Sequence, residues 1–226
     1  MKKFILSIVL LLISNSSFSH VDHYSSFNYL EYELFRNNKN IGFHKFVFDR
    51  SNDHLKVSSD IEFNITKLGV DLYKYKAKSE EIYKNGILQN FTSKTKQNKK
   101  EKYVNISFDK EKNQFLINGS SYKGPASKDF IIGTWWNHEI VNAKSQISAI
   151  SGRIIEQKVS FIGKEKININ GEEYSTLHFN FSSANEELPE KKKLNTDIWY
   201  DENNFLWIKA SFNKQGHWEY RLKVKK

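Results

Sequence analysis

The sequence predicts a mainly β protein: a single curved antiparallel sheet or half-open β-barrel, with one short helix or crossing loop near residues 128–148. Three observations predict this class. Apolar and polar side chains alternate along most of the chain, as they do in half-buried strands. Asn-Gly pairs, which favour tight hairpin turns, separate several alternating segments. Residues 128–148 are rich in apolar side chains but do not alternate, so this segment is predicted to leave the regular strand pattern.

The N-terminal residues have the layout of a secretory signal peptide. Met1-Lys2-Lys3 is basic, Phe4 to Ile13 is apolar apart from Ser7, and small residues follow. A membrane span needs about 20 apolar residues, so this run is too short for the alternative, an uncleaved anchor. We expect residues 1–19 to be a signal peptide cleaved after Ser19, and residues 20–226 to form a single β-rich domain. The mature protein is then expected to be periplasmic and not membrane-spanning.

The strands follow in order along the mature chain. Residues 55–66 alternate over a dozen positions and predict a long half-buried strand. Shorter alternating segments predict strands at 73–78, 104–108, 177–181, 206–212 and 218–224. Asn85-Gly86, Asn118-Gly119 and Asn170-Gly171 predict hairpins, because both residue types tolerate positive φ. Consecutive strands are therefore expected to be antiparallel neighbours.

Two segments interrupt this pattern. In residues 128–148, Thr134 is placed to cap a short helix that starts at Trp135. Residues 184–193 are charged, contain Pro189 and predict an exposed loop or a short helical excursion. A long sheet must cover its apolar face, so we expect it to curl, with residues 130–141 near the mouth or on the concave face.

Composition narrows the function. The chain has no Cys, which excludes disulfides, Cys-ligated metal sites and a thiol nucleophile, and an exported chain without Cys fits a bacterial periplasm. The formal net charge is +9, yet only four of the 35 basic residues are Arg, the residue type best suited to bidentate phosphate contacts. Most Lys residues are interleaved with acidic ones along predicted strands. We therefore expect a solvated sheet face and no nucleic-acid partner.

The most unusual cluster is Trp135, Trp136, Asn137 and His138. The two indoles are candidates for the rim of a ligand pocket, with Asn137 offering a hydrogen bond to a head group. In the alternative interpretation, one Trp fills the core and Asn137 caps local backbone. The predicted ligand-binding set combines this cluster with strand side chains expected on the concave face: Trp135, Trp136, Asn137, Phe63, Tyr73, Phe179 and Ile208.

Signals of catalysis are weak. Glu80 and Glu81 are neighbours in a strand and therefore point to opposite faces, so they cannot act as a carboxylate pair. His44, His178 and His217 are far apart in sequence and are expected on the polar face. The sequence has no nucleophile elbow and no phosphate-binding loop, and it predicts no catalytic residue, cofactor or metal site. One alternative is a copper site at the mature N-terminus, built on His20 and His23 if cleavage falls after Ser19.

Motifs along most of the mature chain add a resemblance to a known family. They are listed in order: Tyr32, Asn38, Ile41-Gly42 and His44, then residues 81–88 and Thr95, then residues 134–137, and finally Trp199-Tyr200-Asp201. This order resembles an uncharacterised family of exported proteobacterial proteins, a domain of unknown function. That family is similar to periplasmic lipoprotein carriers with the LolA-like half-open β-barrel, which hold lipid chains in an apolar concavity. The resemblance implies a fold and, by analogy only, a lipid or lipoprotein ligand.

Three functional hypotheses follow. The first is a non-enzymatic periplasmic carrier for an apolar or amphiphilic, lipid-like ligand. The second is a scaffold, a barrel with a filled core that binds an envelope protein partner. The third is an exported enzyme, including the copper variant. An apolar cavity above about 300 Å³ would support the first hypothesis, whereas a barrel filled by its own side chains would exclude it.

Overall fold

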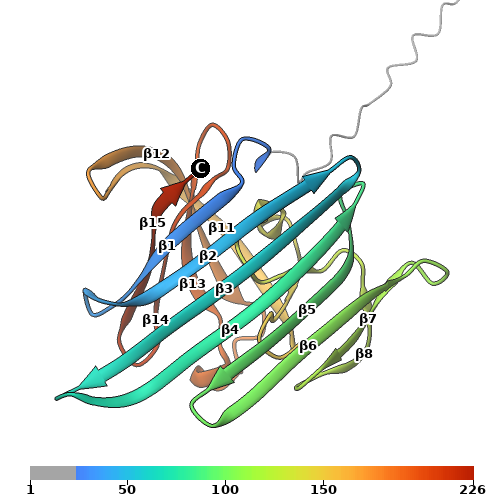
Figure 1. The fold of residues 1–226 in the computed structure, drawn as a ribbon, viewed down its shortest axis with the longest axis horizontal. Helices are drawn as coiled ribbons and strands as arrows, with labels where there is room; N and C mark the ends of the chain where they lie inside the picture. Colours follow the sequence, from blue (N-terminus) through green and yellow to red (C-terminus); the bar gives the residue numbers. More distant parts are fainter. Residues whose placement is uncertain (1–23) are drawn as a thin grey trace, which may run out of the picture.

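The computed structural model describes residues 24–226 as one sheet of 15 strands (Figure 1). The signal peptide predicted for residues 1–19, and the histidine pair His20 and His23, lie outside the described residues. The strands up to the sheet edge are β1 (Tyr29–Arg36), β2 (Lys39–Ser51), β3 (His54–Lys67), β4 (Val70–Lys84), β5 (Ile87–Gln97), β6 (Lys100–Asp109), β7 (Gln114–Gly119) and β8 (Lys123–Ser127). The remaining strands are β9 (Ile131–Ile132), β10 (Ser145–Ile147), β11 (Ile154–Ile169), β12 (Glu172–Ser183), β13 (Asn195–Asp201), β14 (Trp207–Asn213) and β15 (His217–Lys225).

Strands that follow each other in sequence are neighbours in the sheet, as the alternating pattern predicts. The order is β8-β7-β6-β5-β4-β3-β2-β1-β15-β14-β13-β12-β11-β10-β9, so the first and last strands pair in its middle. All pairs are antiparallel except the short pair of β9 and β10. The two edges, β8 and β9, do not pair with each other. The predicted single curved, half-open sheet is thus confirmed, and its open edge falls where the chain was expected to leave the strand pattern.

The tight turns use the residues that the sequence singles out. Asn85-Gly86 and Asn170-Gly171 both have positive φ, at 49° and 74° and at 54° and 87°, as two-residue hairpin turns require. Asn118-Gly119 differs from the prediction. Asn118 pairs with Lys123 across a longer loop, so the β7–β8 hairpin exists but this dipeptide is not its turn. The Asn118-Gly119 pair therefore predicted a hairpin at the right place, but the loop between β7 and β8 is longer than the two residues expected.

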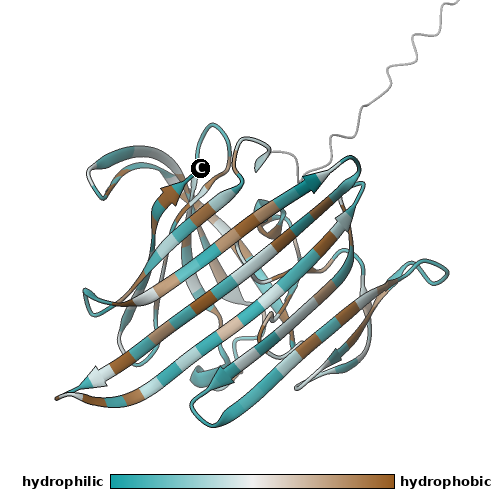
Figure 2. Ribbon diagram, viewed as in Figure 1, coloured by the Kyte–Doolittle hydropathy of each residue, from teal (hydrophilic) through white to brown (hydrophobic). Residues whose placement is uncertain are grey.

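The apolar face of the sheet is turned inward and is filled by aromatic side chains. Brown and teal residues alternate along the front strands of the ribbon in Figure 2, which is the predicted period of two. The largest fully buried side chains are Trp136, Trp207, Tyr24, Tyr32, Tyr200, Phe46, Phe91 and Phe181. Two of the buried tyrosines donate their hydroxyls to backbone carbonyls: Tyr32 to Trp207 O at 2.7 Å and Tyr200 to Trp135 O at 2.8 Å. The space between the walls is therefore packed rather than hollow.

The open edge is closed by residues 128–153, named here the seam segment, which contains β9, the 3-10 helix η2 (His138–Val141) and β10. The N-cap of η2 is Asn137, whose side chain accepts from Glu139 N; the expected cap, Thr134, instead donates to Glu81. The helix therefore begins three residues later than expected. The seam segment reaches the other edge of the sheet through Ser151 O, which accepts from Ser121 N at 2.9 Å.

Two smaller expectations have different outcomes. Residues 184–193 contain the short 3-10 helix η3 (Glu190–Lys192), as predicted. The expectation that His44 lies on the polar face is wrong: it is buried, and its ring packs against that of Phe46 at a tilt of 37°, with 4.2 Å between the centroids. His44 has the same strand parity as Phe46 and Phe48, which places all three inside. Burial lowers the pKa of His44 to about 3, so the ring is neutral in the core.

Within residues 24–226, no helix is long and apolar enough to cross a bilayer.

Candidate functional site

A cleft of about 440 Å³ lies where the seam segment meets the ends of two hairpins, β4–β5 and β6–β7. We call it the seam cleft. Its walls come from the hairpin residues Tyr83, Asn85, Gly86, Ile87, Leu88, Phe108, Asn113 and Phe115, and from the seam residues Lys128, Asp129, Phe130, Ile131, Ile132, Asn137, Glu139, Asn142 and Ala143. It is therefore assembled from segments up to about sixty positions apart, which only the curling of the sheet brings together.

The seam cleft has an apolar floor and a polar rim. Ile132, Phe115, Tyr83 and Leu88 form the buried floor, with exposed fractions between 2% and 7%. The rim residues are exposed, and they carry charges or amides: Asn85, Asn113, Lys128, Asp129 and Asn142. Concave sites of a few hundred cubic ångströms with this division of apolar and polar groups are typical of small-molecule binding sites.

A buried carboxylate holds the seam segment against β4 behind the cleft floor. Glu81 is 1% exposed. Its Oε1 accepts from Trp136 Nε1 at 2.9 Å and from Thr134 Oγ1 at 3.0 Å, and its Oε2 accepts from Tyr83 OH at 2.5 Å. Two of the three donors therefore come from the seam segment, which positions that segment across the open edge.

Burial controls the electrostatics of this network. No ion pair to Glu81 is found among the described residues, so its charge is stabilised by the three hydrogen bonds alone. Desolvation raises the pKa of Glu81 above its usual value, although all three hydrogen bonds act in the opposite direction. Glu80, the preceding residue, faces outward and pairs with Lys56, as the expected opposite orientation requires.

The predicted ligand residues divide among three places. Of the seven, Asn137 alone lines the seam cleft. Trp136 and Ile208 are fully buried, and Trp136 fills the core with its ring edge-on to Tyr83 at 5.8 Å. Trp135 is half-buried and packs edge-on against Trp207 at 5.4 Å. The alternative weighed for this cluster, a core Trp beside a capping Asn137, describes the geometry found here.

The other three predicted residues lie on distant parts of the wall. Phe63 and Tyr73 contact each other near the β3–β4 turn, with ring centroids 6.0 Å apart. Phe179 packs between Phe161 and Tyr200 on the opposite wall. Alternation along the strands predicts that these side chains point inward. It does not predict which parts of the inner face are left accessible to a ligand. The cleft residues on the hairpin ends were missed for the same reason, although the lack of alternation at 128–148 marked the right segment.

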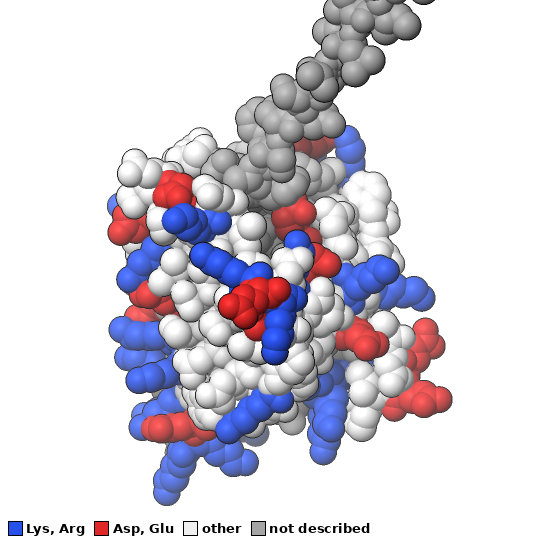
Figure 3. Space-filling model, turned by 90° about the vertical axis from the view of Figure 1, so that its right-hand side faces the viewer, with Lys and Arg blue, Asp and Glu red and all other residues white. Residues whose placement is uncertain are grey.

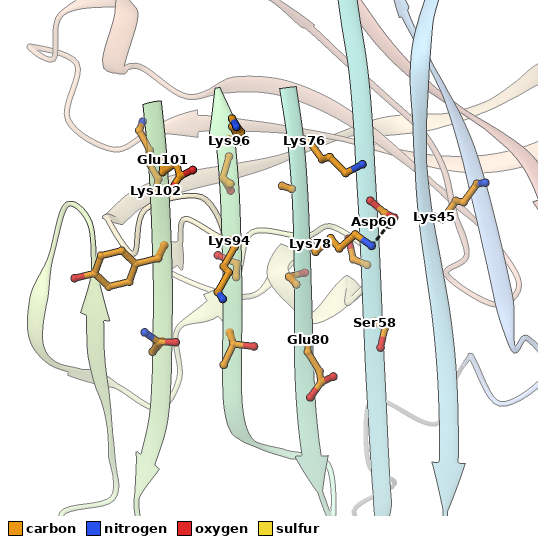
Figure 4. Close-up of a pocket in the computed structure, with 18 of the residues that line it drawn as sticks. Lys45, Ser58, Asp60, Lys76, Lys78, Glu80, Lys94, Lys96, Glu101 and Lys102 are labelled. Atoms are coloured by element: carbon orange, nitrogen blue, oxygen red, sulfur yellow. Dashed lines mark ion pairs between the residues drawn. The ribbon is translucent and has the colours of Figure 1, made fainter. Parts of the chain in front are cut away.

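A second concave surface is a shallow trough of about 1100 Å³ on the outer side of β2–β6 (Figure 4). Lysines on neighbouring strands lie side by side along it: Lys45, Lys76, Lys78, Lys94, Lys96 and Lys102. Lys76 pairs with Glu62 at 2.9 Å and Lys78 with Asp60 at 3.4 Å. Basic and acidic side chains are also interspersed on the adjoining surface (Figure 3). This mixture of charges is the solvated sheet face that the composition predicts.

Among the described residues, no group of three or more His, Asp or Glu side chains is arranged so that it could hold a metal ion. His178 lies between Glu165 and Asp197, each 3.0 Å from one of its ring nitrogens, and stacks on Trp199. His217 is exposed and lies elsewhere. The predicted copper site depends on His20 and His23, which lie outside the described residues.

The profile of a domain of unknown function, DUF6134, matches residues 32–223, which include most of β1, β2 to β14, most of β15 and the whole seam segment. The chain belongs to the DUF6134 family. The expected membership of an uncharacterised domain family is thereby confirmed. No curated protein matches the sequence.

The fold of this DUF6134 chain is supported by a solved structure. It is similar to a β-barrel-like protein of a domain of unknown function, DUF1849, from Brucella abortus, with a TM-score of 0.59 and 9% sequence identity, covering 88% of this chain and 96% of that one. A DUF1329 family protein from Desulfovibrio piger aligns over 91% of this chain and 88% of its own, also at 9% identity, but its TM-score of 0.22 carries no argument. The first similarity shows a shared barrel-like fold.

Proposed function

We propose that this DUF6134 protein is a non-enzymatic periplasmic binding protein that carries an amphiphilic, lipid-like ligand in the seam cleft. The observation that carries the proposal is the apolar floor of the cleft, about 440 Å³ in volume, beneath a rim of charged and amide side chains. An acyl chain would contact Ile132, Phe115 and Leu88, and a polar head group would remain among the rim residues.

The ligand site differs from the one expected by analogy with lipoprotein carriers. In that analogy, lipid occupies the middle of the half-open barrel. Here the middle is occupied by Trp136, Trp207 and Tyr200, each fully buried, so a carrier that holds its ligand inside the barrel is excluded. The seam cleft lies at the open edge, where the seam segment rather than a second sheet wall covers the apolar face. A ligand there would enter from the side and contact the part of the chain that holds Asn137.

The filled middle supports a second candidate function, a scaffold that binds an envelope protein. A partner segment could use the same apolar floor, because a peptide side chain and an acyl chain both favour burial there. The two candidates differ in what is recovered from the cell. A carrier is purified with a bound small molecule, whereas a scaffold is purified bare and binds only its partner.

The first experiment is native mass spectrometry of the mature protein purified from its own periplasm, followed by extraction and identification of bound lipid. Displacement of a dansyl-labelled fatty acid then measures binding directly. In the variant Ile87→Asn, the side chain that borders the cleft becomes polar, and we expect fatty-acid affinity to fall by about tenfold.

Val47→Asn is the matched control, because Val47 and Ile87 are both 49% exposed and Val47 lies in the outer trough instead. This variant is expected to bind the fatty acid like the parent. If the protein is recovered bare and no fatty acid or membrane extract binds it, the carrier function is excluded. Equal losses in both variants would place binding outside the seam cleft.

A further inference from the structure

The β3–β4 hairpin projects beyond the rest of the sheet as a two-stranded finger, residues 64–73 (Figure 1). Pairing of β3 with β2 ends at Phe63, opposite Gly42, and pairing of β4 with β5 begins at Tyr75, opposite Gln97. Residues 64–73 therefore form strand pairs only with each other. The finger is separate from the seam cleft, because none of its residues lines that cleft.

The tip of the finger is apolar and exposed. Leu68 is 94% exposed, Val70 is 60% exposed and Leu72 is 54% exposed. Leu68 is the most exposed large apolar side chain of the described residues. Three such side chains within five positions form a continuous apolar tip, whereas isolated exposed apolar residues are ordinary on protein surfaces.

The turn at the tip makes Leu68 unusual. Leu68 and Gly69 have φ of 50° and 76°, nearly the values of Asn85-Gly86, at 49° and 74°. Asn occupies the first turn position there and in Asn170-Gly171, because it tolerates the left-handed conformation, which a larger branched side chain disfavours. Leu68 therefore neither favours its turn nor packs in the core. Neither turn geometry nor burial therefore explains why a leucine stands at this position.

Basic side chains lie on the finger and around its base. Lys67 is next to the tip, opposite Val70, and the β5–β6 hairpin beside the base carries Lys96, Lys99, Lys100 and Lys102. None of these five lysines forms an ion pair among the described residues. A groove of about 300 Å³ at the base is lined by Glu62, Phe63, Asn64, Lys74, Tyr75, Lys76, Lys96 and Asn98.

Most of the acidic groups nearby are already neutralised. Asp71 lies 2.7 Å from Lys74 and accepts from Asn64 at 2.6 Å, and both contacts lower its pKa. Glu62 pairs with Lys76. Glu101 is the remaining acid beside these lysines. The surface around the finger is therefore net basic, with an apolar point at its centre.

We propose that the finger docks the protein on an anionic phospholipid membrane. Leu68, Val70 and Leu72 would enter the interfacial layer of the bilayer, while the surrounding lysines bind lipid phosphates. Apolar insertion and electrostatic attraction together give reversible membrane binding, and each alone is weak. The charged groups also favour lipid over a protein partner, since protein interfaces are enriched in Arg and aromatic residues and depleted in Lys. Flexible lysines suit phosphates in a fluid surface.

Vesicle sedimentation of the mature protein tests this inference. The parent is expected to bind phosphatidylcholine vesicles that contain phosphatidylglycerol more strongly than vesicles of phosphatidylcholine alone. Leu68→Asn restores the turn residue used elsewhere in the chain, so it should fold, and it is expected to lower partition by about tenfold. Leu116→Asn removes a 42% exposed leucine from β7 and should bind like the parent.

A label gives an independent measurement, because the chain has no Cys. An environment-sensitive dye on Leu68→Cys is expected to shift to the blue with anionic vesicles, and the same dye on Leu116→Cys is expected not to shift. The inference is overturned if the parent binds no vesicles, or if Leu68→Asn binds as well as the parent. It is also overturned if a photo-crosslinker at position 68 captures a protein rather than lipid in intact cells.

Discussion

Glu81 shows at the scale of one residue how a polar group can organise an apolar interior. An unpaired buried carboxylate is costly, and three donors offset that cost here without a cation. Because two of the donors, Thr134 and Trp136, belong to the seam segment, the cost of burying the charge falls if that segment is in place. The same residue therefore couples the β4 wall to the segment that forms the seam cleft.

Glu81→Gln is expected to stabilise the protein increasingly as pH rises. Burial raises the folded-state pKa of Glu81 above its usual value of 4.5, so the folded protein holds the proton more tightly. Stability from this group is present below the unfolded pKa and is lost as pH rises through the folded pKa. Gln has no such loss, and its oxygen can still accept from Trp136 and Thr134.

Urea unfolding of Glu81→Gln and the parent across this pH range measures the difference. The gap in unfolding free energy should widen above about pH 4.5, by at most about 1.4 kcal/mol per pH unit. Glu81→Ala is the contrasting variant, since it leaves the donors unsatisfied at about 1–3 kcal/mol each. A gap that does not change with pH would show that Glu81 does not titrate differently in the folded state.

At the scale of an element, the β3–β4 finger has a turn residue that does not favour the backbone conformation it adopts. Leu68 occupies a left-handed position that Asn fills in comparable turns. We expect Leu68→Asn to raise the free energy of unfolding by about 1 kcal/mol, because Asn tolerates that conformation and little apolar burial is lost. Urea midpoints test this, with Asn85→Leu expected to lower stability by a similar amount. A Leu68→Asn protein less stable than the parent would mean that Leu68 packs in the fold.

The sequence predicted the strands more accurately than it predicted the burial of single residues or the position of the seam cleft. Alternation located β3 within one residue, from 55–66 to His54–Lys67, because a strand with one buried face has an obligatory period of two. The same signal could not place His44, since a buried polar residue was read as a surface one. It also could not find the seam cleft. The cleft joins hairpin ends to residues 128–143, and their contacts depend on how far the sheet curls.

The whole molecule is a meander whose ends meet in the middle of its sheet. Almost every strand pairs with the next along the chain, and the one long-range pair, β1 with β15, joins the two halves. The sheet is left with edges at β8 and β9, which are only a few residues apart in sequence. The seam segment covers this gap, so the closure of the barrel and the shape of the seam cleft depend on the same contacts.

Gly119→Ala is expected to loosen that closure. A Cβ at Gly119 would lie 2.6 Å from Ser151 O and 3.0 Å from Gly152 Cα, closer than the backbone of the seam segment can accept without moving. We expect a loss of about 1–3 kcal/mol in unfolding free energy, as overpacking usually gives, and faster amide exchange at residues 148–153. Gly171→Ala is the control. Its φ of 87° disfavours alanine, but nothing lies within 4 Å, so faster exchange should remain at the β11–β12 turn. Unchanged exchange at 148–153 in Gly119→Ala would mean that the seam segment is held by the Glu81 network without this contact, and fatty-acid binding should then be unaffected as well.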